Sequence, residues 1–600
     1  MSILSSLSGR RLRLAAATLA LSGLSLWAAL PASAVPSATT RRHEAEIRSL
    51  VRAMSLPDKV GQLFSTYAYG DTADTTDPTY VAQNQALLGV DNAAELVSKY
   101  HVGGIIYFGY ANNLLNPPQI AKLSNDVQRV AVATGPKIPL LISTDQEGGN
   151  VTRIGAPVAI SAGNMALGAG FDPTAAYAMS RVTGQQLKAM GINADDAPVV
   201  DTNTNPNNAA DGPRAFGDRP RQVATFGAAS VLGYQSAKIA ATAKHFPGLG
   251  STSVNTDFGV ATSDQTRREF EANDLPAFRA AVAAGVDSIM AAHIVAPALD
   301  PTEAPASLSY PMVTGILRNE LHYDGVVVTD ALNAEALHDY TNAQRSVDAI
   351  KAGVDQLLIP TDLAGSIQAV LDAVQSGDIS EKRIDQSVTR LLRLKQKLGI
   401  LRTAQVDEAV VARRVGTPAQ LTVQDRVAHR AITLLRNSAG VLPLQPDSGK
   451  TVLVTGYGVT TTTNLAAAIA GKGVTTTRVV TGTAPNEAAI TAAVAAAEQA
   501  DYVVDVSNNA WSDPAQRQLA DRLRATGTPV VVLAVGAPYE LGFAPATPTF
   551  LASYGYQPPS MRAAADVLFG AQPRGRLPIT VRTPDGSAVV AKWGSGLRYR

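Results

Sequence analysis

Short apolar runs alternate with longer segments of helical pattern between about residue 60 and residue 360. Eight runs have the length and composition of buried strands: 60–64, 102–108, 139–145, 192–201, 240–246, 286–294, 325–330 and 355–360. Strands separated by helices are typical of a parallel sheet with helices on its faces. The pattern therefore predicts an α/β fold, most simply a (β/α)8 barrel of the TIM type.

The clearest helical pattern follows the last of these runs. Ile384, Val388, Leu391 and Leu392 lie at positions i, i+4, i+7 and i+8, and they form one apolar stripe on a basic helix. We expect this helix to close the barrel on its outside.

A second unit follows a charged stretch that lacks an apolar period. Strand patterns at 451–456, 501–506 and 529–535, with an alanine-rich helix at 486–500, predict a smaller three-layer α/β/α domain. Six hundred residues fit two domains and a leader. We divide the chain into a leader (1–34), a barrel domain (35–400), a linker (401–425) and a C-terminal α/β domain (426–600).

The first 34 residues have the pattern of an export signal. Basic residues at 10, 11 and 13 precede an apolar segment at about 14–30, and Ala32-Ser33-Ala34 offers a cleavage site. A membrane anchor is the alternative, but serine and glycine interrupt the short segment. We expect a secreted protein, exported by the general secretory or the twin-arginine route. Beyond the leader, no stretch is long and apolar enough to span a bilayer.

Composition excludes several classes of function. The chain has a net charge of +1 and no cysteine. The charge gives no electrostatic reason to expect nucleic acid or an anionic membrane as partner. The missing cysteines exclude disulfides, thiolate metal sites and cysteine nucleophiles. The seven histidines are scattered, and no pair has the i, i+4 spacing of helical metal ligands, so we expect no metal and no organic cofactor.

Five of the predicted strands end in polar residues: Asp145, Asp201, Lys244-His245, His293 and Asp330. Any one of these could simply mark a strand end. In a barrel, however, the C-terminal ends of the strands form the mouth where active sites lie, so five together favour a site there.

Charged side chains near these ends suit a pocket for one sugar ring. Aspartate accepts hydrogen bonds from hydroxyls, and arginine, lysine and histidine donate to them. Three cations also suit a phosphate, but the chain has no glycine-rich phosphate loop followed by Lys-Ser/Thr. The residues that suit a sugar pocket are Asp145, Arg153, Arg214, Lys244 and His245.

Four motifs resemble glycoside hydrolase family 3, in particular its β-N-acetylglucosaminidase (β-hexosaminidase) branch. They are Asp145-Gln-Glu-Gly-Gly, Arg214-Ala-Phe-Gly, Lys244-His-Phe-Pro-Gly-Leu-Gly and Val328-Thr-Asp-Ala-Leu. The resemblance extends over residues 48–400. Ala431-Ile-Thr-Leu-Leu-Arg-Asn, Val567-Leu-Phe-Gly and Gly575-Arg-Leu-Pro-Ile-Thr resemble the C-terminal domain of the same family.

The resemblance implies a retaining exo-glycosidase whose nucleophile is Asp330, which forms a glycosyl-enzyme intermediate. The alternative role for Asp330 is a helix N-cap after a strand. By the same resemblance, the five pocket residues hold the hydroxyls of the sugar. Glucosidases of the family usually have a tryptophan after the nucleophile, whereas Ala331 follows here. That favours terminal β-linked N-acetylglucosamine, from peptidoglycan or chitin fragments, as the substrate.

One motif departs from the branch. The branch carries its general acid/base on a loop as Asp-Ser-His, and Asn255-Thr256-Asp257 stands in that place. Either Asp257 acts alone as the acid/base, or the acid comes from elsewhere, including the second domain, or the protein is a catalytically impaired glycan-binding protein. A β-glucosidase or β-xylosidase of the same family is a further alternative.

Overall fold

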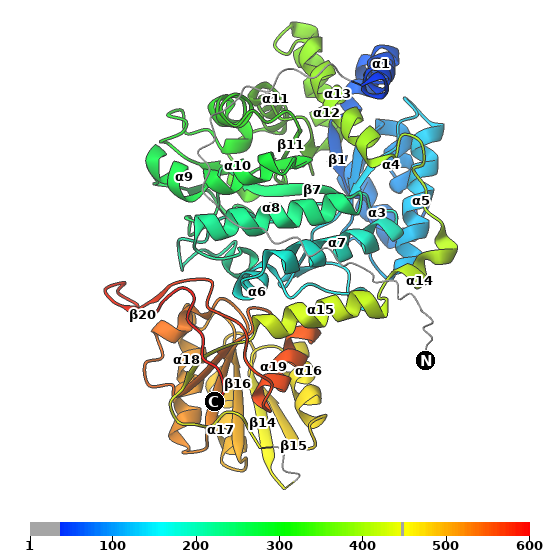
Figure 1. Cartoon of the computed structure of the whole chain (residues 1–600). Coiled ribbons are helices and arrows are strands. Elements are labelled where there is room, and N and C mark those ends of the chain that lie inside the picture. The colour runs from blue at the N-terminus through cyan, green and yellow to red at the C-terminus, as the bar shows by residue number, and fades with distance from the viewer. Residues whose placement is uncertain (1–36, 446–448) are drawn as a thin grey trace, which may run out of the picture. The chain divides into compact units, whose positions relative to one another are not determined.

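A computed structural model describes residues 37–445 and 449–600 (Figure 1). The predicted leader lies outside the described residues. Residues 46–600 form one compact unit. Helix α1 (Ala38–Ala53) begins in the separate unit that ends at residue 45. Within the described residues, no helix is long and apolar enough to cross a membrane.

The larger domain is built on eight strands that run around a barrel. Parallel pairing joins them as two four-stranded sheets, β12-β1-β2-β3 and β11-β9-β7-β6. A parallel bridge between Val328 and Gln356 closes one seam, and a hydrogen bond from Asn193 N to Ile142 O (2.9 Å) closes the other. The strands are β1 (Phe64–Thr66), β2 (Gly104–Ile106), β3 (Leu141–Ser143), β6 (Ala194–Asp195), β7 (Ala240–Phe246), β9 (Ser288–Ala291), β11 (Val326–Thr329) and β12 (Leu357–Leu358). The predicted barrel is confirmed.

The first predicted strand is displaced. Residues 60–62 belong to helix α2 (Leu56–Gln62), and β1 begins at Phe64. Ser55 starts this helix with a capping box to Asp58, and Pro57 lies in its first turn. These local signals favour a helix over the strand that the apolar run predicted.

Helices connect the barrel strands, as in Figure 1. They are α3 (Pro78–Leu88), α4 (Ala93–Tyr100), α5 (Pro117–Ala133), α6 (Asn164–Ala169), α7 (Pro173–Ala189), α8 (Pro220–Ser236), α9 (Arg267–Asn273), α10 (Leu275–Ala283), η3 (Pro311–Glu320), α11 (Asn342–Ala352) and α12 (Leu363–Ser376).

The predicted basic helix is α13 (Glu381–Leu398), and all four residues of its stripe are buried. Leu391 of the stripe, with Leu394 and Leu398, packs against Leu141, Ala194, Ala240 and Val326. Those four residues begin strands β3, β6, β7 and β11. The helix therefore covers the N-terminal floor of the barrel rather than its outer wall, opposite the end where active sites lie.

The stretch predicted as a linker is partly helical. Helix α15 (Pro418–Ala431) begins inside it with a capping box on Thr417 and contacts α6 and α7 of the barrel and α19 of the next domain. Amphipathic burial of Val427, Ala428 and Ala431 stabilises this helix.

The C-terminal domain has a six-stranded sheet in the order β13-β18-β17-β16-β14-β15. Helices α17 and α18 contact each other and helices α16 and α19 contact each other, on the two faces of the sheet (Figure 1). This confirms the predicted three-layer domain. Its strands are β13 (Thr433–Asn437), β14 (Thr451–Gly456), β15 (Thr475–Val480), β16 (Tyr502–Ser507), β17 (Val530–Ala534) and β18 (Thr549–Ala552); its helices are α16 (Val459–Ala470), α17 (Glu487–Ala497), α18 (Pro514–Ala525) and α19 (Pro558–Leu568).

Candidate active site

A pocket of about 850 Å³ opens at the C-terminal ends of the barrel strands. It is lined by all seven residues that the sequence analysis assigned to catalysis or sugar binding, namely Asp145, Arg153, Arg214, Lys244, His245, Asp257 and Asp330, whereas the strand-end residues Asp201 and His293 are not part of its lining. The structure thus brings together side chains that lie up to 185 positions apart in the chain, because parallel strands end on one rim.

Asp330 directly follows β11, and its backbone is held between strands. Its N–H donates to Ala291 O (2.8 Å), and its own Oδ1 accepts from Ala331 N (2.8 Å). Burial raises the pKa of the Asp330 carboxyl, but the imidazoles of His245 and His293, the Ala331 N–H and Lys244 together outweigh burial and hold that pKa below its usual value. The carboxylate therefore stays ionised, as a nucleophile must.

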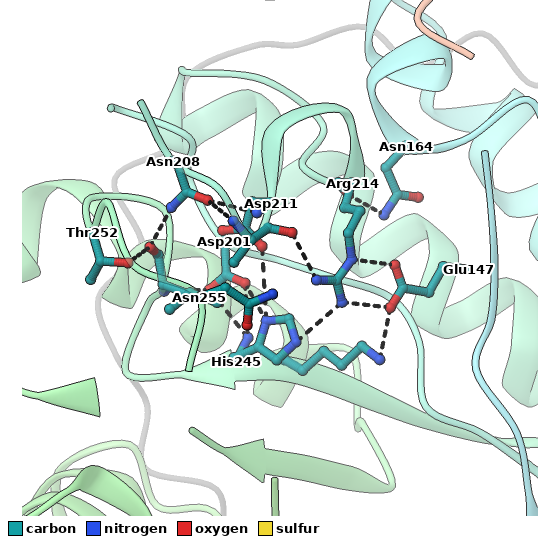
Figure 2. Close-up of polar contacts among 12 residues, drawn as sticks. Glu147, Asn164, Asp201, Asn208, Asp211, Arg214, His245, Thr252 and Asn255 are labelled. Atoms are coloured by element: carbon teal, nitrogen blue, oxygen red, sulfur yellow. Dashed lines mark hydrogen bonds and ion pairs between the residues drawn. The ribbon is translucent and has the colours of Figure 1, made fainter. Parts of the chain in front are cut away.

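A largely buried network of two cations and two carboxylates forms one wall, and Figure 2 shows Glu147 and Arg214 within it. Glu147, on β4 (Gln146–Gly148), accepts two hydrogen bonds from Arg214, at 2.8 and 2.9 Å, and contacts Lys244 Nζ at 2.8 Å. Lys244 also donates to Asp145 Oδ1 (2.8 Å). Burial by itself raises the pKa of Glu147, yet the two cations hold it well below its usual range. Glu147 therefore fixes both cations in one orientation.

The paired glycines that follow Glu147 have a packing role. Gly148 and Gly149 have positive φ angles, and a Cβ on Gly148 would lie 2.4 Å from Cβ of Ser161. A Cβ on Gly149 would lie 3.0 Å from Cα of Gly163. The glycines thus allow the β4 hairpin to pack against residues 161–163.

Two aspartates, Asp201 and Asp211, lie on the Nδ1 side of the His245 ring (Figure 2). Its Nδ1 lies 2.7 Å from Asp201 Oδ2 and 4.0 Å from Asp211 Oδ1. Arg214 Nη2 lies 3.3 Å from Nε2 of the same ring. Burial lowers the pKa of the His245 imidazole, but the charge of Asp201 and its hydrogen bond to the ring outweigh burial and raise that pKa above its usual value.

Asp211 is buried, and neither of its carboxyl oxygens has a hydrogen-bond partner. Burial, with the charge of Asp201, raises the pKa of Asp211 to about 8. Asp201, Asp211 and His245 are close enough to hold a metal ion. However, Asp201 already accepts from the backbone N–H groups of His245 and Leu249 and from the imidazole. The protonated, uncharged form of Asp211 avoids the cost of burying a charge that has no hydrogen-bond partner.

Asp257 lies on the loop after β7 and lines the same pocket as Asp330. The loop is fastened to the segment after Asp330: Ala336 N donates to Thr256 O (3.2 Å) and Glu335 N donates to Asp257 O (3.4 Å). The side chain of Asn255, which replaces the aspartate of the family dyad, accepts from Asp257 N (2.9 Å) and so stabilises the turn.

Asp257 and Asp330 are shifted in opposite directions. Asp257 is exposed as a residue, yet partial burial of its carboxyl and the charge of Asp330 raise its pKa above the usual value. The shifts suit Asp257 to donate a proton and Asp330 to stay ionised.

The second domain forms part of the wall through Asn509, Trp511, Ser512, Ala537 and Tyr539. Asn203 of the barrel donates to the Tyr539 hydroxyl (3.1 Å). Among the described residues that line the pocket, the second domain contributes no carboxylate. Glu540, next to Tyr539, is buried and accepts from Ser507 instead. An acid supplied by the second domain therefore has no support in this structure.

Several pocket residues had no role in the sequence analysis: Glu147, Asp211, Trp511 and Tyr539, with Phe108 beside Arg153 and Tyr110 stacked on Phe108. Glu147 lies inside the motif Asp145-Gln-Glu-Gly-Gly, so the sequence could have indicated that it belongs to the site. No sequence signal marked Trp511 and Tyr539 as site residues, because only the packing of the two domains brings them to the barrel mouth.

Comparison with known proteins identifies the family. Residues 55–394 match the glycosyl hydrolase family 3 N-terminal domain, and residues 432–594 match the glycosyl hydrolase family 3 C-terminal domain. The chain belongs to glycoside hydrolase family 3, which confirms the resemblance that its motifs showed.

Similar proteins have related names. Beta-hexosaminidase A of Pseudoalteromonas piscicida is 34% identical over 380 residues, which are 59% of this chain and 62% of that protein. The chain thus spans less than two thirds of that relative. Beta-N-acetylglucosaminidase/beta-glucosidase of Cellulomonas fimi is 29% identical, over 68% of this chain and 69% of that one. The solved family 3 beta-N-acetylglucosaminidase of Paenibacillus sp. str. FPU-7 is 36% identical with a TM-score of 0.80, over 88% of this chain and all of that one.

Proposed function

We propose that the chain is a secreted retaining exo-glycosidase that releases terminal β-linked N-acetylglucosamine from glycans such as peptidoglycan or chitin fragments. The observation that carries the proposal is the pair Asp257 and Asp330, which line one pocket with opposite pKa shifts. The names of the hexosaminidase and N-acetylglucosaminidase relatives support N-acetylglucosamine as the sugar that is released. The leader pattern supports export.

The proposed reaction has two steps. Asp330 attacks the anomeric carbon while protonated Asp257 gives its proton to the leaving glycosidic oxygen, so that a glycosyl-enzyme ester forms. Asp257, now a carboxylate, then takes a proton from a water molecule that attacks the same carbon and releases Asp330. Asp145, Arg153, Arg214, Lys244 and His245 hold the hydroxyls of the sugar.

Turnover of a chitin oligosaccharide by wild type, Asp257→Asn and Asp330→Asn tests both roles. Loss of general acid/base catalysis is expected to slow Asp257→Asn by about 10²–10⁴-fold. Asp330→Asn is expected to be inactive and to form no adduct with a 2-fluoro sugar, read by intact mass. If Asp257→Asn turns over like wild type, the acid/base assignment is wrong.

Two alternatives have their own measurements. The Cellulomonas fimi relative is also named a beta-glucosidase, so aryl N-acetylglucosaminide, glucoside and xyloside should be compared. A preference for the glucoside or the xyloside would overturn the proposed sugar. A wild type that binds glycans but gives no 2-fluoro adduct would instead be a glycan-binding protein.

A further inference from the structure

A second hollow, which we call the basic hollow, lies between the start of α8 and the hairpin of β19 (Val581–Arg582) and β20 (Val589–Ala591). Its volume is about 760 Å³, and it shares no lining residue with the catalytic pocket. Four cations and two apolar side chains dominate its lining: Arg219, Arg221, Arg582, Lys592, Val589 and Trp593.

The cations of the basic hollow lack nearby negative charge. No aspartate or glutamate belongs to its lining in the described chain. Arg219 contacts Asp218 at 3.5 Å, and Arg582 donates to Gly586 O. In the described residues, Arg221 and Lys592 form no ion pair, and both side chains are exposed. An incoming anion would therefore meet at least two uncompensated cations.

Trp593 is held as a rigid surface beside these cations. Its indole N–H donates to Gln222 Oε1 (2.7 Å), and the buried Gln222 donates in turn to Gly168 O (2.9 Å). The indole also packs on Phe171, with ring centroids 5.0 Å apart. The residue remains 39% exposed. Because the ring is already held in place and remains exposed, little conformational entropy is lost when a ligand packs on it.

We propose that the basic hollow binds an acidic sugar, whose ring packs on Trp593 and whose carboxylate pairs with Arg221 and Lys592. The apolar C–H face of a pyranose suits the indole, and carboxylates pair well with arginine. The start of α8 at Pro220, which no side chain caps, adds positive potential to the same place.

The hollow suits a sugar better than a nucleic acid. Nucleic-acid sites use a long basic stripe, whereas this chain has a net charge of +1 and its four cations are confined to one hollow. Because the hollow is separate from the catalytic pocket, an acidic polymer bound there would hold the protein near its glycans. The inference does not depend on the proposed activity.

Calorimetric titration of the full chain with hexagalacturonate at low salt tests the proposal. The methyl ester of the same oligosaccharide is the uncharged control. Wild type is expected to bind the acid at least tenfold more tightly than the ester. The double variant Arg221→Gln/Lys592→Gln should bind the acid at least tenfold more weakly than wild type.

The double variant Arg268→Gln/Lys382→Gln is the matched control, because it removes two exposed cations elsewhere on the chain. It should bind like wild type, and all variants should hydrolyse an aryl glycoside at one rate. The proposal is overturned if wild type does not bind the acid, if acid and ester bind equally, or if both double variants lose affinity equally. Tighter binding of a DNA 12-mer at the same residues would show that the hollow takes nucleic acid instead.

Discussion

Buried charge at single residues organises the pocket. Glu147 is 4% exposed and contacts both Arg214 and Lys244, the two cations assigned to the sugar hydroxyls. Removing one partner of a buried ion pair leaves the other charges buried and uncompensated, which costs far more than breaking a pair at the surface.

Glu147→Gln keeps the shape of the side chain and removes its charge. We expect a loss of about 3–5 kcal/mol in the free energy of unfolding, measured with denaturant, and a higher KM. Asp378→Asn is the control, because Asp378 pairs with Lys351 at 2.8 Å and the two side chains are 50% and 45% exposed. That change should cost less than about 1 kcal/mol. Equal losses in the two variants would contradict the role of Glu147.

The two shifted carboxyls predict a bell-shaped pH dependence of kcat/KM. Asp330 must be ionised, and its pKa is lowered, so activity is lost only as pH falls through that lowered value. Asp257 must be protonated for the first step, and its pKa is raised, so activity is lost as pH rises through that raised value.

Asp257→Asn should remove the alkaline limb on an aryl glycoside with a good leaving group, because such a substrate needs little protonation. The acid limb, which belongs to Asp330, should remain. An unchanged alkaline limb would assign it to another group.

At the scale of elements, helix α15 connects the two domains. Thr417 begins it with a capping box to Gln420, and the helix packs on α6, α7 and α19. Its N-terminal turn therefore depends on the Thr417 side chain, in a stretch that the sequence analysis predicted to be a linker.

Thr417→Ala should lower the free energy of unfolding by about 1 kcal/mol through loss of the cap. Thr422→Ala is the matched control on the same helix, since Thr422 is exposed and only donates to Pro418 O within the helix. Alanine is the better helix former there, so the control should be neutral or slightly stabilising. Thermal unfolding of both variants measures the difference, and equal shifts would exclude the capping role.

At the scale of the whole molecule, the pocket depends on both domains. Trp511 of the C-terminal domain lines it and packs edge-on against Tyr539. Trp511 thus forms part of the pocket wall, although the groups assigned to the reaction all belong to the barrel.

Trp511→Ala should lower kcat/KM for a chitin oligosaccharide about tenfold, because an aromatic contact of this kind contributes roughly 0.5–1.5 kcal/mol beyond burial. An aryl N-acetylglucosaminide, which offers no further sugar rings, should lose less than threefold. Trp511→Phe should retain most of the activity on the oligosaccharide. Equal losses on both substrates would place Trp511 against the terminal sugar instead.

The sequence by itself determined the class of fold and the residues of the barrel rim. Short apolar runs indicate buried strands and a 3.6-residue period indicates the buried face of a helix, and all eight predicted runs overlap observed barrel strands. Asp145, Lys244, His245 and Asp330 follow from strand ends, because parallel strands end on one side. Arg153 and Arg214 came from the charged segments near those strand ends, and the family resemblance assigned them to the hydroxyls of the sugar.

Only the tertiary structure decided what depends on contacts between distant segments. It placed α13 on the floor of the barrel, gave Glu147 its two cations and brought Trp511 to the pocket. It also fastened the loop of Asp257 beside Asp330, where burial and charge shift the two carboxyls apart. A sequence pattern indicates which residues are buried, but it does not indicate which buried side chains contact one another. The chemistry of this pocket depends on those contacts.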